Sequence, residues 1–206
     1  MPLGAILATG WASGLNLYGT ALLLGVAGRL DWADTPAALQ HSWVLAVLGV
    51  MYALEFVIDK IPFVDSAWDA IHTAIRPLGG ALLAAAMAND AGSSEVLAAL
   101  LGGSFSLTAH GAKASTRVLI NTSPEPVTNI AASLGEDGIV AGMVGLALAQ
   151  PVIAGSVAVV AAILSLVVIW LVVRALRRLH RRWRGWWSRR RPTDDTTATT
   201  GDHYRE

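Results

Sequence analysis

Residues 152–173 read VIAGSVAVVAAILSLVVIWLVV, and this uncharged apolar run decides the fold class. About 20 consecutive apolar residues are enough to carry an α-helix across the hydrocarbon core of a bilayer. The run is rich in Val and Ile, but a lone β-strand cannot satisfy its backbone hydrogen bonds in lipid. The sequence therefore predicts a transmembrane helix here.

The composition of the whole chain agrees with a membrane protein and argues against a soluble domain. Hydrophobic residues make up 54% of the 206 residues and charged residues only 15%, whereas soluble domains are about 25% charged. The chain has no cysteine, which excludes disulfides, thiolate metal sites and cysteine nucleophiles.

Apolar segments of membrane length recur along the chain. They predict an all-α, polytopic integral membrane protein with about six transmembrane helices, at 3–27, 42–60, 66–88, 94–118, 134–150 and 152–173. The last two are joined by Gln150-Pro151 as a tight helical hairpin. We divide the chain into a transmembrane domain (1–173), a basic, aromatic juxtamembrane helix (174–191) and a disordered polar tail (192–206).

Prolines and glycines indicate interrupted helices. Pro77 with Gly79-Gly80 predicts a kink or break, so that residues 65–76 form a separate half-helix that lies in the interface or re-enters the membrane. Pro124 and Pro126 end the preceding helix, and residues 127–133 are expected to restart as a short one.

The formal net charge of zero hides a strong asymmetry. Residues 1–173 hold five Lys and Arg against eleven acids, a net charge of −6, and residues 174–206 hold ten Arg against four acids, a net charge of +6. Basic residues beside a span favour the cytoplasmic side. We therefore place the C-terminus, and with six spans the N-terminus, in the cytoplasm.

The basic segment also contains tryptophans, which anchor at the level of lipid head groups. Such a juxtamembrane segment is expected to bind anionic lipid, at about 1 kcal/mol per basic residue. Tethering beside a membrane makes nucleic acid the weaker expectation, and a pure topology anchor is the plainer alternative. The expected lipid-binding residues are Arg174, Arg177, Arg178, Arg181, Arg182, Trp183, Trp186 and Trp187.

The charged residues inside the transmembrane domain form three stripes. In the first stripe Glu55 and Asp59 share one helix face and Lys60 follows them, and in the other two the spacing places every member on one face. The stripes are Glu55, Asp59 and Lys60; Asp65, Asp69, His72 and Arg76; and His110, Lys113 and Arg117. Beyond the third come Glu125, Glu136 and Asp137. All are expected in the cytoplasmic half of the membrane.

Charges at a helix centre in the bilayer cost about 2.5–3.5 kcal/mol each, so they persist when paired, hydrated or binding something. One interpretation is structural ion pairs, such as Asp69 with Arg76 or Glu55 with Lys113. The other is a hydrated polar cavity open to the cytoplasm, which the density of charge favours.

The stripes leave the charge of a ligand open. Glu55, Asp59, Asp69 and His72 are candidate ligands for a divalent cation. The four Lys and Arg side chains of the stripes suit a phosphate or lipid head group equally well. His72 is a candidate proton relay beside Asp69, although a lone histidine is more often structural.

A short internal similarity suggests an inverted repeat. Leu15–Gly19 and Leu107–Gly111 share the pattern Leu-(Asn/Thr)-apolar-(Tyr/His)-Gly, and each precedes a proline-containing polar junction. Inverted repeats with interrupted helices are common in secondary transporters. On this hypothesis Asn16 and Tyr18 join the site, whereas a chance match is the alternative.

Several motifs resemble an uncharacterised bacterial membrane family, domain of unknown function 4126, over residues 5–173. They are Ser13-Gly-Leu-Asn16-x-Tyr18, a long motif from Leu54 to Pro77, His110-Gly-x-Lys113-x-x-x-Arg117, and Asn121-x-Ser-Pro124-Glu125-Pro126-x-x-Asn129. The resemblance implies a bacterial cytoplasmic membrane protein with a shared polar centre. It implies no reaction, because the family has no established activity.

Three functions remain as hypotheses. The first is a small transporter or channel-like permease for an ion or small charged solute, with Asn16 and Glu125 added to the three stripes as its binding residues. The second is a lipid-handling protein or enzyme acting on a phosphorylated head group, and the third is a non-catalytic scaffold. No strong catalytic motif is present. A divalent cation is the candidate cofactor, and homo-oligomerisation stays open.

Overall fold

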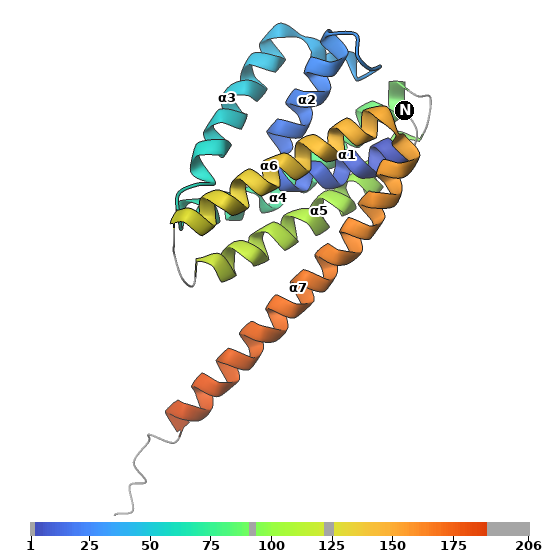
Figure 1. Ribbon diagram of the computed structural model, residues 1–206. Coiled ribbons are helices and arrows are strands. Elements are labelled where there is room, and N and C mark those ends of the chain that lie inside the picture. Colours follow the sequence, from blue (N-terminus) through green and yellow to red (C-terminus); the bar gives the residue numbers. More distant parts are fainter. Residues whose placement is uncertain (1–2, 91–93, 122–125, 189–206) are drawn as a thin grey trace, which may run out of the picture. The chain divides into compact units, whose positions relative to one another are not determined.

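The computed structural model describes residues 3–90, 94–121 and 126–188, and all regular structure in these ranges is helical. It consists of seven α-helices and one 3₁₀-helix (Figure 1). In chain order they are α1 (Leu3–Leu15), α2 (Leu17–Arg29), η1 (Ala37–Gln40), α3 (Ser42–Ile58), α4 (Val64–Asp90), α5 (Glu95–Ile120), α6 (Pro126–Ala149) and α7 (Pro151–Ser188).

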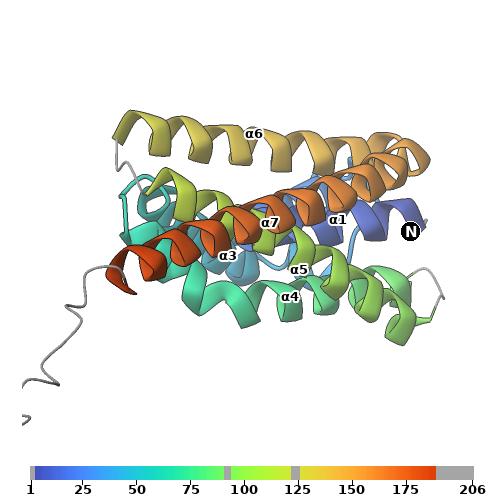
Figure 2. The ribbon, with the colours of Figure 1, turned by 90° about the horizontal axis from the view of Figure 1, so that it is seen from below.

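The chain divides into two compact units, residues 1–172 and 173–206. In the first unit α1 packs against α4, α5 and α6, and α4 packs along α5. Figure 2 shows α6 on one side of α1, with α4 and α5 on the other.

Small residues allow these helices to approach closely. A Cβ atom added at Gly10 of α1 would lie 2.7 Å from the Cα of Gly102 on α5. Alanines dominate the surrounding core, including Ala8, Ala12 and Ala84. Helix association in membranes relies on such contacts, because lipid is as apolar as the helix surfaces and supplies little hydrophobic driving force.

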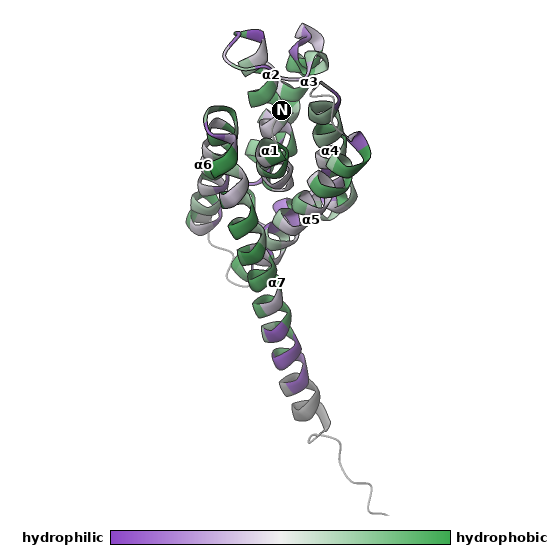
Figure 3. Cartoon of the chain, turned by 90° about the vertical axis from the view of Figure 1, so that its right-hand side faces the viewer, coloured by the Kyte–Doolittle hydropathy of each residue, from purple (hydrophilic) through white to green (hydrophobic). Residues whose placement is uncertain are grey.

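The outer faces of the unit are apolar. Val152 and Leu82 expose 78% and 72% of their surface, and Figure 3 shows hydrophobic residues along its helices. Among the described residues, three helical stretches are long and apolar enough to cross a membrane: Val64–Asn89, Val127–Ala149 and Pro151–Arg181. Leu3–Leu15 and Ser42–Ile58 are shorter apolar helices. These features are those of a helical membrane protein, and the count of six spans stays a prediction.

The first predicted span is broken at Asn16. The break predicted at Pro77 and the separate half-helix 65–76 are wrong, and a kink at Pro77 stays a prediction. Asn16 adopts an extended conformation between α1 and α2, and Figure 1 shows the chain changing direction there. The Asn16 side chain accepts a hydrogen bond from Gly19 N at 2.7 Å and caps α2. By contrast, α4 continues through Pro77, since helices in membranes tolerate proline when neighbouring groups compensate for its missing N–H.

The two ends of α6 test two further predictions. The tight connection expected at Gln150-Pro151 is present, because α6 ends at Ala149 and α7 begins at Pro151. The separate short helix at 127–133 is wrong, because α6 runs without a break from Pro126. Proline fits the first turn of a helix, where its missing N–H has no partner to lose. The inverted repeat stays a prediction, and its two motif copies differ in backbone, since α5 is continuous through Leu107–Gly111.

The second unit is described in part. The α7 helix continues to Ser188, and Arg174, Arg177, Arg178 and Arg181 are exposed. Arg182, Trp183, Trp186 and Trp187 belong to the same helix, but their side chains lie outside the described residues, as does the whole of the predicted disordered tail.

Candidate functional site

Eight charged side chains from α3 to α6 meet in one buried cluster, which we call the charge network. Seven of them expose 3% or less of their surface, and the side chain of the eighth, Glu136, is 15% exposed. The network consists of Glu55, Asp59, Asp65, Asp69, Arg76, Lys113, Arg117 and Glu136.

Arg76 on α4 is the first of three cations in the network. One terminal nitrogen lies 2.6 Å from Glu55 Oε1, and the other lies 3.0 Å from Asp69 Oδ1. The same second nitrogen donates to Gly14 O at 3.4 Å and to His110 Nδ1 at 3.0 Å. The predicted Asp69–Arg76 pair is therefore present, with Glu55 as a second partner.

Lys113 on α5 is the second cation. Its ammonium donates to Asp59 Oδ2 and, at 3.2 Å, to the Leu15 carbonyl. Glu136 Oε2 lies 3.3 Å away, and Glu55 Oε1 lies 4.0 Å away. The predicted Glu55–Lys113 pair is thus present at the outer limit of an ion pair, and Asp59 is the closer partner.

Arg117, one turn further along α5, is the third cation. It lies 2.7 Å from Glu136 Oε2 and 3.7 Å from Asp65 Oδ2. It also donates to the Asn129 side chain on α6 and, at 3.3 Å, to the Asp59 carbonyl. Arg117 therefore joins the end of α3 to the start of α6.

The network carries more negative than positive charge. Five carboxylates face three cations, a formal excess of two negative charges. Buried Glu55 Oε2, Asp59 Oδ1 and Asp69 Oδ2 have no hydrogen-bond partner. Arg76 Nε and Arg117 Nε also lack one, but each guanidinium faces two carboxylates. The network therefore lacks mainly positively charged partners for its carboxylate oxygens.

The two histidines lie beside the network in defined hydrogen bonds. His72 places Nδ1 2.9 Å from the Trp68 carbonyl and Nε2 3.1 Å from the Tyr18 hydroxyl. A carbonyl only accepts, so Nδ1 donates, and a neutral imidazole accepts from Tyr18 at Nε2. These contacts join His72 to Tyr18, not to Asp69 as the relay hypothesis supposed.

His110 lies between two polar neighbours. Its Nδ1 accepts from Arg76, which is donor-only. The other ring nitrogen, Nε2, lies 3.2 Å from Thr73 Oγ1. The Thr73 hydroxyl itself donates to the Asp69 carbonyl. This chain of bonds fits a neutral imidazole with its proton on Nε2.

The break at Asn16 supplies backbone oxygens to the network. In a continuous helix the Leu15 carbonyl would accept from Gly19 N, but Gly19 N bonds to the Asn16 side chain instead. The freed Leu15 carbonyl accepts from Lys113, and the Gly14 carbonyl accepts from Arg76. The end of α1 therefore presents its oxygens to two buried cations.

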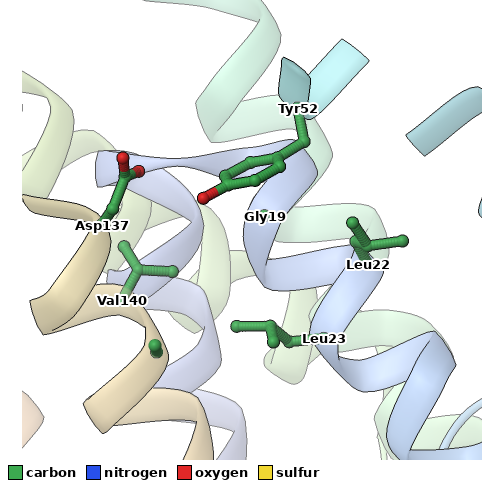
Figure 4. A pocket seen from close by; sticks show the side chains of 7 residues that line it. Gly19, Leu22, Leu23, Tyr52, Asp137 and Val140 are labelled. Atoms are coloured by element: carbon green, nitrogen blue, oxygen red, sulfur yellow. The ribbon is translucent and has the colours of Figure 1, made fainter. Parts of the chain in front are cut away.

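A small pocket adjoins this break between α2, α3 and α6 (Figure 4). It has a volume of about 130 Å³ and is lined by Gly19, Leu22, Leu23, Tyr52, Asp137, Val140 and Ala141. Asp137 accepts from the Asn16 amide at 3.1 Å through Oδ1, and its buried Oδ2 has no partner. Asn16 thus connects the pocket to the end of α1.

The remaining predicted residues lie elsewhere. The Lys60 ammonium lies 3.0 Å from the Phe56 ring centroid and donates to the Phe56 carbonyl and to Ser133 on α6. Glu125 lies outside the described residues. The three stripes are therefore brought together as a packed network, and the open, hydrated cavity stays a prediction.

The binding residues expected from the sequence do not include three residues of α6, of which Glu136 is named only as lying beyond the third stripe. Asn129, Ser133 and Glu136 are spaced 4 and 3 apart, which places them on one helix face, and they contact Arg117, Lys60 and Lys113. The same helical spacing that revealed the other stripes could have revealed this one. The expected break after residue 133 concealed it.

A divalent metal centre gains no support from the geometry. Within the described ranges, no three or more His, Asp and Glu side chains are arranged to hold a metal ion. Of the candidates, Glu55 and Asp69 face Arg76, Asp59 faces Lys113, and His72 contacts Tyr18. The carboxylates are thus separated by cations of the protein itself.

Comparison with known proteins places the chain in a family without assigning it a function. No curated protein and no solved structure matches it. A model of the family described as Domain of unknown function (DUF4126) matches residues 3–175. That match covers the whole charge network and the break at Asn16. The chain therefore belongs to the DUF4126 family.

Proposed function

We propose that this protein is a small membrane permease that moves an ion or small charged solute through the charge network. The observation that carries the proposal is the buried excess of two carboxylates, with unpartnered oxygens on Glu55, Asp59 and Asp69. Ionisable groups at membrane depth are costly and commonly line substrate or ion pathways.

Stability alone is a weak reason for such a network. Desolvating a buried ion pair often costs as much as its Coulomb attraction returns, and apolar replacements of similar volume are frequently neutral or stabilising. A purely structural cluster would also be expected to match its charges and fill its hydrogen bonds. The excess negative charge of the network instead suits a positively charged ligand, including a proton.

The pocket beside Asp137 is the candidate route towards the network. It joins an apolar wall of Leu22 and Leu23 to a carboxylate, a common arrangement in ligand sites. Asp137 bonds to Asn16, and Asn16 adjoins the carbonyls that contact Arg76 and Lys113. A change in the conformation of Asn16 would therefore alter both the pocket and the network.

We place the permease in the bacterial cytoplasmic membrane, with six spans and both termini in the cytoplasm. The asymmetry of basic residues supports this orientation. The exposed arginines of the second unit are proposed to hold anionic lipid. A phosphorylated head group at the network gains no support, because Arg76, Lys113 and Arg117 already face carboxylates.

Flux into proteoliposomes tests the proposal. Wild-type protein is screened against Na⁺, K⁺, Rb⁺, NH₄⁺ and H⁺ gradients beside Asp59→Asn and Asp69→Asn, which keep side-chain size and remove one charge. Both variants are expected to lose at least about tenfold in flux. Glu95→Gln is the matched control, because Glu95 is exposed at the start of α5. Flux unchanged by both Asn variants would contradict the proposal.

A further inference from the structure

We propose that the Lys113 ammonium occupies a binding site for a monovalent cation, and that the transported cation takes its place. The inference rests on the proposed permease function and names its substrate class. Lys113 would then act as a tethered competitor that fills the site when the substrate is absent.

The first support is the oxygen shell around the Lys113 nitrogen. The Leu15 carbonyl lies 3.2 Å away, Glu136 Oε2 lies 3.3 Å away, and Asp59 Oδ2 is in direct contact. Glu55 Oε1 completes the surroundings at 4.0 Å. Every one of these partners is an oxygen, as cations such as K⁺ and ammonium require.

The second support is the origin of the Leu15 carbonyl. It is free because the helix ends there and the Asn16 side chain takes its usual partner, Gly19 N. The C-terminal end of a helix carries partial negative charge. Unwound carbonyls and half-helix ends of this kind coordinate monovalent ions in secondary transporters.

The third support is a pair of buried carboxylate oxygens near the ammonium that have no hydrogen-bond partner. Glu55 and Asp59 expose 0% and 3% of their surface, and Oε2 of the first and Oδ1 of the second have no hydrogen-bond partner. Two further acceptors are therefore buried next to a shell that already holds one positive charge. With its formal excess of two negative charges, the network can hold a cation while Lys113 stays protonated and moves aside.

The same shell favours a monovalent over a divalent ion. Among the described residues, two carboxylates lie within hydrogen-bonding distance of the ammonium, and the third close ligand is a neutral carbonyl. Divalent ions in proteins are usually held by more carboxylates. Among the described residues, no group of three or more His, Asp and Glu side chains is arranged to hold a metal ion.

The inference is tested by removing the Lys113 ammonium and asking whether an added monovalent cation restores the melting temperature. Lys113→Ala is purified in detergent, and its melting temperature is measured in chlorides of N-methylglucamine, Na⁺, K⁺, NH₄⁺ and methylammonium at equal ionic strength. The variant is expected to melt below wild type in N-methylglucamine. K⁺, NH₄⁺ or methylammonium is expected to recover about half or more of that loss, since a ligand that binds only the folded state stabilises it.

Lys60→Ala is the matched control. It removes another lysine from the same end of the bundle, but the Lys60 ammonium contacts the Phe56 ring, the Phe56 carbonyl and Ser133 rather than a shell of carboxylates. Cation-specific recovery is expected for Lys113→Ala alone. If Lys113→Ala gives no folded protein, Lys113→Gln is measured in the same way, because its amide keeps a donor near Leu15.

Equal responses of the Lys113 and Lys60 variants, or no cation-specific response in any folded Lys113 variant, would overturn the inference. The melting-temperature result and the flux result test different claims. Recovery without wild-type flux would keep the cation site and remove the permease. Flux that is sensitive to Asp59→Asn, without recovery in a Lys113 variant, would keep the permease and remove the tethered competitor.

Discussion

The Glu55 carboxylate on α3 lies 2.6 Å from the Arg76 guanidinium on α4, and both side chains are fully buried. Asp69, two turns before Arg76, contacts the same guanidinium at 3.0 Å. This triad joins the first two charged stripes across the short connection between α3 and α4. It raises the question of whether the network exists for stability or for function.

Arg117→Lys is expected to destabilise the protein although it keeps the charge. The guanidinium contacts Glu136, Asp65 and Asn129 at once, and a single ammonium cannot replace its planar set of donors. Leaving one buried partner unsatisfied costs about 1–3 kcal/mol. Thermal unfolding in detergent should show a clear drop in melting temperature.

Arg29→Lys is the control for that substitution. Arg29 is exposed, and among the described residues it donates to the Gln40 carbonyl. A lysine there should leave the melting temperature within about 1 °C, because exposed substitutions usually change stability by less than about 0.5 kcal/mol. Equal effects of the two changes would show that the contacts of Arg117 contribute little.

Asn16→Ala should cost more than the loss of an ordinary helix cap. The Asn16 side chain accepts from Gly19 N and donates to Asp137. Losing a cap costs about 1 kcal/mol, and an unpartnered Asp137 adds about 1–3 kcal/mol. Ser94→Ala, which removes only the cap of α5, should cost about 1 kcal/mol by comparison.

Asn16→Asp separates the two roles of that side chain. The aspartate keeps an acceptor for Gly19 N, but it loses the amide donor and places a second carboxylate beside Asp137. We expect it to remain destabilised, and full recovery in Asn16→Asp would show that capping alone matters. Unfolding by heat is again the measurement.

Gly14→Ala and Gly145→Ala are expected to have opposite effects. A Cβ at Gly14 would lie 2.7 Å from the Ala109 Cβ and against the Ser106 carbonyl, and overpacking of this kind costs about 1–3 kcal/mol. A Cβ at Gly145 meets nothing within 4 Å, so alanine gains about 0.5–1 kcal/mol of helix propensity. Similar melting temperatures for the two variants would contradict the packing of α1 on α5.

Topology can be tested without background labelling, because the chain has no cysteine. Asp34→Cys lies at an exposed position in the connection between the first two predicted spans, and Ser188→Cys lies at the end of α7. Six spans with both termini inside predict that an impermeant thiol reagent labels Asp34→Cys in intact cells. Ser188→Cys should need permeabilised cells, and labelling of both positions from the same side would contradict the model.

The helices and the charged stripes along them could be predicted from local patterns. The tight connection at Pro151 follows from a proline at a helix start, and the Asp69–Arg76 pair follows from helical spacing. These features depend on residues close together in sequence, so a single chain carries enough information to find them.

The broken helix could not be placed in the same way. Pro77 is the stronger breaker by propensity, yet the break lies at Asn16. Asn16 is stabilised by its partners, since its amide bonds to Asp137, 121 residues away. The freed carbonyls of Gly14 and Leu15 face cations on α4 and α5, which is a tertiary effect that local propensity does not contain.

The central claim is that the charge network serves function rather than stability, and an apolar replacement of its triad tests this most directly. Glu55→Leu/Asp69→Leu/Arg76→Met removes the three charges together, so no buried partner within the triad is left behind. Melting temperature and proteoliposome flux are measured on the same preparation. We predict a melting temperature close to that of wild type, because removing the desolvation cost of three buried charges offsets the loss of the Arg76 donor by His110 Nδ1 and the Gly14 carbonyl, with flux reduced to background. A folded triple variant that retains wild-type flux would contradict the account.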